Sequence, residues 1–235
     1  MIEASPVHEQ VLEETKQKFG AKVVDYKIAV LSQKDGATVD FYSGESSTTG
    51  NSIFLENTSF FRGVKPEKRI TAKLDTIVEH MEHIIDYVKL DVQGAELVVL
   101  SGASETLEKA TFVQLEVSVV EYNQGGACWY EVDHVLRQRG YYLYDFGDPS
   151  RNQKLFHTKG IGQIDLLYVK PNSMSLPKWL IDNNVEFCGS NRIGVNAVPL
   201  KRSINLVLCG AAMAAFIGGY MAGTIRKGRN GTKQN

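Results

Sequence analysis

The sequence lacks the features that mark several classes of protein. Its three cysteines are odd in number and widely spaced, which argues against a disulfide framework and against a zinc site. The formal net charge is -1, and the body of the chain has no Lys/Arg stripe with interleaved aromatics, so nothing predicts a nucleic-acid partner. The first residues show neither a signal peptide nor an Arg-rich transit segment. A reducing compartment and no bound metal are the simplest expectations.

The first 170 residues have the pattern of one α/β domain. With 235 residues, 43% of them hydrophobic, the chain can bury one substantial core and carry an appendage. Strand and helix patterns alternate across residues 1–110, and two further strands follow at 141–146 and 164–169. We therefore expect a sheet that is parallel in its middle and antiparallel at one edge.

Local signals place individual elements within this domain. A helix is predicted over 7–19, ended by Gly20, and a second one over 130–139. The Asp35-Gly36 pair predicts a hairpin between strands at 22–30 and 37–42. Residues 44–66 are rich in Ser, Thr, Gly and Asn, which is typical of a functional lid or a poorly ordered loop.

The central pattern is the stretch 86–103, DYVKLDVQGAELVVLSGA, which reads as strand, tight turn and helix. Asp91 stands at the end of the strand, where open α/β sheets bind their ligands. It is therefore the first functional candidate. The alternative is that Asp91 and Glu96 only cap the helix start and match its dipole.

This stretch resembles the signature of the FkbM-type family of S-adenosylmethionine-dependent methyltransferases. The signature is a strand ending in Lys-Ile/Leu-Asp-Val-Glu-Gly, followed by Ala-Glu and a helix; here Gln93 stands where Glu is usual. Supporting matches are IEASP at 2–6, VQLEV at 113–117 and, more loosely, AVLSQKDG at 29–36 and Asn51-Ser52. The resemblance implies a class I, Rossmann-like methyltransferase fold over residues 1–170.

The resemblance also assigns the site. Glu3, at the end of the second strand of such a fold, would accept hydrogen bonds from both ribose hydroxyls of S-adenosyl-L-methionine. Asp91 would lie near the transferred methyl group and orient or deprotonate a hydroxyl nucleophile. Glu96, Glu116 and Asn51 are the expected substrate contacts, with simple ion pairing as the alternative for Glu116. For Glu3, the alternative is an exposed residue near the N-terminus.

One part of such a site is missing from its usual place. Class I methyltransferases carry a Gly-rich cofactor loop after a first strand, and that strand lies between the second and the fourth. No Gly-x-Gly occurs before residue 20. The pattern therefore predicts an N-terminally incomplete sheet, with a fragment of a longer protein favoured over a rearranged domain.

The C-terminal part has a different composition. Residues 171–203 contain three prolines and are predicted to be a linker, and residues 226–235 form a short basic tail. Between them, 204–225 carry no charge and would span about 33 Å as a helix, enough for a bilayer core. The alternatives are a core helix of the soluble domain and a segment lying on a membrane surface.

We expect this run to be a transmembrane helix. Its small residues recur every four positions and would form a groove for a helix–helix dimer: Gly210, Ala214, Gly218 and Ala222. The basic clusters on both sides suit lipid headgroups but do not settle the orientation, since the larger one lies C-terminal. The missing signal peptide favours a single-pass tail anchor with a cytosolic body.

Together these patterns predict a membrane-anchored methyltransferase. It would transfer a methyl group to an oxygen of a hydroxyl-bearing small molecule or sugar. The alternative is a non-catalytic interaction module with a degenerate methyltransferase fold.

Overall fold

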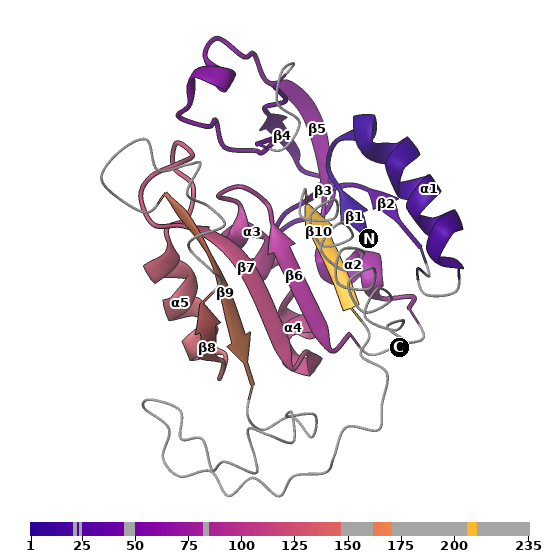
Figure 1. Cartoon of the computed structure of the whole chain (residues 1–235), viewed down its shortest axis with the longest axis vertical. Coiled ribbons are helices and arrows are strands. Elements are labelled where there is room, and N and C mark those ends of the chain that lie inside the picture. The colour runs from indigo at the N-terminus through magenta and orange to yellow at the C-terminus, as the bar shows by residue number, and fades with distance from the viewer. Residues whose placement is uncertain are drawn as a thin grey trace, which may run out of the picture.

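The computed structural model describes residues 1–20, 23, 25–44, 50–81, 85–146, 162–170 and 206–210 (Figure 1). Within these residues a seven-stranded sheet has the order β2-β1-β10-β6-β7-β9-β8, and a smaller sheet has the order β3-β5-β4. The strands of the large sheet are β1 (Ile2–Glu3), β2 (Lys27–Ile28), β6 (Tyr87–Asp91), β7 (Phe112–Ser118), β8 (Tyr142–Phe146), β9 (Gln163–Val169) and β10 (Leu206–Gly210).

The remaining elements surround this sheet. The small sheet consists of β3 (Val30–Leu31), β4 (Thr38–Phe41) and β5 (Glu67–Ala72). The helices are η1 (Pro6–His8), α1 (Glu9–Phe19), η3 (Ser59–Phe61), α2 (Leu74–Val78), α3 (Glu96–Ser101), α4 (Ser104–Lys109) and α5 (Trp129–Gln138). Neighbouring strands from β2 to β7 pair in parallel, whereas β9 pairs antiparallel with both β7 and β8. The predicted α/β sheet with an antiparallel edge is confirmed.

The two faces of the large sheet differ in polarity. Val88 and Leu90 of β6 and Val113 and Leu115 of β7 are fully buried in the main core, which includes residues of α3, α4 and α5. Successive strand residues point to opposite faces, so Lys89, Asp91, Gln114 and Glu116 share the other face. The apolar face packs into the core, and the other face carries the ionisable and amide side chains.

Strand β10 corrects the expectation of a gap in the middle of the sheet and the expectation of a membrane helix that begins at residue 204. Figure 1 shows it between β1 and β6, the position expected to lack a strand. It runs parallel to both neighbours; Cys209 is paired with Ile2, and Gly210 with Asp91. Val207 and Cys209 are buried in the main core. Leu206–Gly210 are therefore a strand and do not begin a membrane helix, because here two sheet neighbours take up the backbone hydrogen bonds.

The predicted four-residue groove is also changed, since Gly210 belongs to β10. Ala214, Gly218 and Ala222, the 171–203 linker and the 226–235 tail lie outside the described residues. In the part of the chain that the structure does describe, no helix has the length and hydropathy of a membrane span.

The predicted hairpin at Asp35-Gly36 is wrong. Strand β5 lies between β3 and β4, parallel to β3 and antiparallel to β4. The Asp35 carboxylate accepts hydrogen bonds from the Lys73 backbone N–H at 2.7 Å and from the Thr76 hydroxyl at 2.8 Å. This connection is thus tied to the start of α2, and the two flanking strands do not pair with each other.

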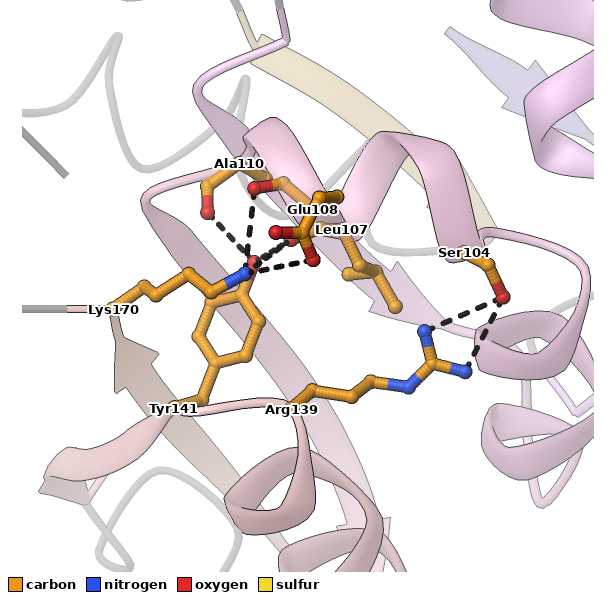
Figure 2. Close-up of polar contacts among 7 residues, drawn as sticks. All are labelled: Ser104, Leu107, Glu108, Ala110, Arg139, Tyr141 and Lys170. Carbon is orange, nitrogen blue, oxygen red and sulfur yellow. Dashed lines mark hydrogen bonds and ion pairs between the residues drawn. The ribbon is translucent and has the colours of Figure 1, made fainter. Parts of the chain in front are cut away.

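The C-terminal end of α4 is closed by side chains from the antiparallel edge (Figure 2). The buried Tyr141 hydroxyl lies 2.8 Å from the Leu107 carbonyl oxygen and 2.7 Å from that of Ala110. The Lys170 ammonium donates to the Leu107 and Glu108 carbonyls and stands 5.3 Å from the centre of the Tyr141 ring. Carbonyls left without helical partners are thereby satisfied, which fixes α4 against the sheet.

Candidate active site

Polar groups gather where the parallel strands end. Glu3 closes β1, Gly210 closes β10 and Asp91 closes β6, and these three strands are adjacent. Glu116 follows on β7, one position beyond the Leu90–Leu115 pair. Because the carboxyl ends of parallel strands lie at one edge of a sheet, three carboxyl groups face the same region.

The turn between β6 and α3 has an unusual backbone. Gln93 has φ 51° and Gly94 has φ 91°. A Cβ on Gly94 would lie 3.1 Å from the Asn123 Cβ and 3.2 Å from the Gly126 Cα. Glycine is therefore needed at position 94, and Gln93 adopts a left-handed conformation that residues other than Gly, Asn and Asp rarely occupy.

The Gln93 side chain joins two of the strand ends. Its Nε2 donates to Asp91 Oδ1 at 2.7 Å and to Glu116 Oε2 at 3.2 Å. Its Oε1 accepts a hydrogen bond from Gln163 Nε2 on β9 at 3.2 Å. One amide thus connects the ends of β6 and β7 to the antiparallel edge.

Asp91 and Glu116 form a pair of neighbouring buried carboxyl groups. Burial raises the pKa of Asp91, and burial together with the charge of Asp91 raises the pKa of Glu116 to about 9. The Gln93 Nε2 contacts both carboxyl groups, which places the two side chains next to each other. At neutral pH these effects favour a protonated Glu116, and two buried carboxyl groups this close resist carrying two negative charges at once.

A buried cation balances this region. The Lys89 ammonium lies 3.4 Å from Asp165 Oδ1, and the Lys89 side chain is almost completely buried. Its charge lowers the pKa of Asp91 and opposes the effect of burial. The charge of Lys89 thus favours the ionised form of Asp91.

A cavity opens between β1, β6, β3 and the loop after β4. It encloses about 480 Å³, open space at its mouth included. Glu3 and Asp91 line it from the strand ends, Val30 and Phe41 give it an apolar wall, and Asn51 lines it from the loop. An apolar lining with a few polar groups is typical of small-molecule sites.

Two polar side chains of this cavity, Glu3 and Asn51, each have a hydrogen bond to a backbone N–H. One Glu3 oxygen accepts the Ser5 N–H at 2.8 Å, and burial raises the Glu3 pKa. The Asn51 Oδ1 accepts the Gly44 N–H at 3.0 Å, whereas its Nδ2 is buried and has no partner among the described residues. Among the described residues, the Asn51 Nδ2 is thus a buried donor without an acceptor at the wall of the cavity.

The described part of the predicted loop packs against the end of β6. The Ser52 hydroxyl donates to the Val92 carbonyl at 3.3 Å, and Glu56 forms a β-bridge with Asn123. Residues 45–49 lie outside the described residues. The loop thus forms one wall of the cavity.

Glu96 occupies a different position from the other candidates. It is fully buried behind the turn, where Oε1 accepts the Gly94 N–H at 3.2 Å. Oε2 has no partner within the described residues, and burial raises the Glu96 pKa to about 8. Glu96 does not line the cavity, so its contact with substrate stays a prediction.

The structure thus brings Glu3, Asn51 and Asp91 to one cavity and places Glu116 beside Asp91. Sequence reasoning missed Gln93 and Lys89 as parts of the site. The alternation Lys89-Leu90-Asp91 puts both charges on one face of a strand, and this signal could have identified the lysine.

Comparison with known proteins agrees with this geometry. The sequence model of the methyltransferase FkbM domain matches residues 1–143. No curated protein and no solved structure matches the chain. The matched region contains Glu3, Asp91, Glu96 and Glu116, whereas Asp165 and β10 lie outside it.

Proposed function

Because this chain belongs to the FkbM methyltransferase family and is therefore an S-adenosylmethionine-dependent methyltransferase, we propose that it binds S-adenosylmethionine in the cavity beside Glu3 and methylates a hydroxyl oxygen next to Asp91. The observation that carries this proposal is the shared cavity. The carboxyl groups of Glu3 and Asp91 line the same space at the ends of β1 and β6.

The residues of the cavity suit this cofactor. A carboxylate accepts hydrogen bonds only, which matches Glu3 to the two hydroxyl donors of a ribose. Val30, Leu31 and Phe41 offer an apolar surface to a flat base. The unpaired Asn51 amide can donate to an acceptor atom of the ligand, which would remove the cost of its burial.

The chemistry at Asp91 follows from its ionisation. When bound, the cofactor supplies an electrophilic methyl group. The Asp91 carboxylate would accept the proton of the acceptor hydroxyl while the methyl group passes to that oxygen and its bond to the cofactor sulfur breaks. A raised pKa makes Asp91 a stronger base than an ordinary aspartate while Lys89 favours its ionised form. Hydroxyl-bearing small molecules or sugars are therefore the proposed acceptors.

Calorimetric titration with S-adenosylhomocysteine tests cofactor binding. Replacing Glu3 by Gln removes the charged acceptor and keeps the side-chain shape, and we expect binding about 10- to 100-fold weaker than in the wild type. The control is Glu9→Gln, an exposed glutamate of α1, which should leave binding unchanged.

The alternative of a non-catalytic module makes the opposite prediction. A folded wild-type chain that releases no heat at millimolar S-adenosylhomocysteine would favour the module and contradict the proposed function.

A further inference from the structure

The Gln93 carboxamide contacts three polar side chains from three strands or strand ends. It donates to Asp91 and to Glu116, and it accepts from Gln163. Its backbone has φ 51°, a conformation that is uncommon for glutamine. An uncommon backbone conformation persists where surrounding contacts hold it in place, and here the three side-chain contacts of Gln93 do so.

The orientation of this amide is fixed by its neighbours. With the oxygen and nitrogen exchanged, an acceptor would face both carboxyl groups, and the amide nitrogen would face the Gln163 amide nitrogen. As observed, both Nε2 hydrogens are used, one for each carboxyl group. Gln93 therefore provides donors only to the pair and cannot supply the proton that the pair shares.

We propose that Gln93 is a positioning residue that holds Asp91 and Glu116 as a pair sharing a single proton. Its two donated hydrogen bonds favour the singly charged state of the pair and hold the Asp91 side chain at the wall of the cavity. The effect on methyl transfer rests on the proposed function, whereas the shared proton does not.

Other ionisable groups act on the same pair. Lys89 of β6 favours its charge, whereas Asp165 of β9 and Glu96 of α3 oppose it. Glu3 of β1 and Tyr122 of the loop after β7 interact with it electrostatically. Gln93 differs from all of these because it is uncharged at every pH, so its influence is constant across a titration.

The test separates the side chain of Gln93 from its backbone. Asparagine tolerates the left-handed conformation well but is one methylene shorter, so Gln93→Asn keeps the turn and loses the reach to the pair. Gln93→Glu replaces both donors by a third carboxyl group. Gln138→Glu, at an exposed position of α5, is the matched control for added charge.

The measurement is a carbon-13 NMR titration of the side-chain carboxyl groups in the full chain. In the wild type one glutamate should remain protonated at pH 7, and its signal should be absent from Glu116→Gln. In Gln93→Asn the pH at which the pair gains its negative charge should rise by about one unit, and further in Gln93→Glu. Gln138→Glu should leave the pair unchanged.

Two results would overturn the inference. One is a Gln93→Asn titration that coincides with the wild type; the other is a Glu116 that titrates near its ordinary value of 4.5. A shifted titration without S-adenosylhomocysteine binding would reject the proposed function and keep the shared proton. In an active enzyme, the acidic limb of the kcat/KM profile should move with the titration.

Discussion

Glu96 is a carboxyl group that the fold keeps away from water. It is fully buried, and its Oε1 accepts a hydrogen bond from the Gly94 N–H. Burial raises its pKa to about 8. An acid whose pKa is higher in the folded than in the unfolded chain folds best when it is protonated. Its contribution to stability is therefore complete below pH 4.5, the ordinary value, and is lost as the pH rises toward 8.

Replacing Glu96 by Gln should consequently stabilise the protein at alkaline pH. The amide keeps an acceptor for the Gly94 N–H and removes the cost of ionisation, so we expect a gain of about 2–4 kcal/mol at pH 8.5 and almost none at pH 4.5. Urea unfolding of both proteins at the two pH values measures this difference. Equal effects of Glu96→Gln at both pH values would show that Glu96 ionises as easily in the folded chain as in the unfolded one.

At the scale of elements, β10 decides whether the sheet is continuous. Without it, β1 and β6 would expose unpaired backbone groups along their facing edges. With it, Val207 and Cys209 enter the same core as Val88 and Leu90, and Gly210 lies beside Asp91 at the site. Of the described strands, the last in the sequence thus fills a central position between the two strands whose ends line the cavity.

A pair of aspartate substitutions tests this role. Val207→Asp places a carboxylate in the core and should reduce the free energy of unfolding by about 3 kcal/mol or more. Val120→Asp introduces the same charge at an exposed valine and is the matched control. If β10 is part of the fold, only Val207→Asp lowers the urea midpoint. A run that serves only as a membrane helix predicts no change in the midpoint from either substitution.

At the scale of the whole molecule, the strand and the predicted membrane span compete for the same residues. With Leu206–Gly210 in the sheet, the uncharged run that remains, 211–225, would extend only about 23 Å as a helix, less than the bilayer core of about 30 Å. The chain therefore cannot place Leu206–Gly210 in the sheet and, at the same time, use all of 204–225 as a membrane-spanning helix. The tail anchor with a cytosolic body stays a prediction.

Thiol labelling before membrane fractionation distinguishes the two states. Cys209 is buried and its pKa is raised to about 12, so it should resist maleimide while β10 is docked. In a chain with Cys128→Ser and Cys188→Ser, carbonate-soluble protein should carry unlabelled Cys209. Membrane-retained protein should carry labelled Cys209. Protein that is retained in the membrane with Cys209 protected would contradict the competition.

The sequence by itself determined the elements with strong local patterns. The strand-turn-helix around Asp91, the parallel middle and the antiparallel edge follow from hydrophobic periodicity and glycine positions, which act over a few residues. The family resemblance placed Glu3 and Asp91 at one site, and the structure puts both at one cavity. Local rules failed at Asp35-Gly36, since the Lys73 and Thr76 contacts to Asp35 join residues nearly 40 positions apart.

Only the tertiary structure decided the position of Leu206–Gly210 and the role of Gln93. An uncharged run is equally suited to lipid and to the centre of a sheet, because both environments are apolar, and the choice depends on whether β1 and β6 offer it hydrogen bonds. The Gln93 amide matters because three strands bring Asp91, Glu116 and Gln163 within its reach. Such convergence arises from contacts between distant parts of the chain, which no pattern along the sequence records.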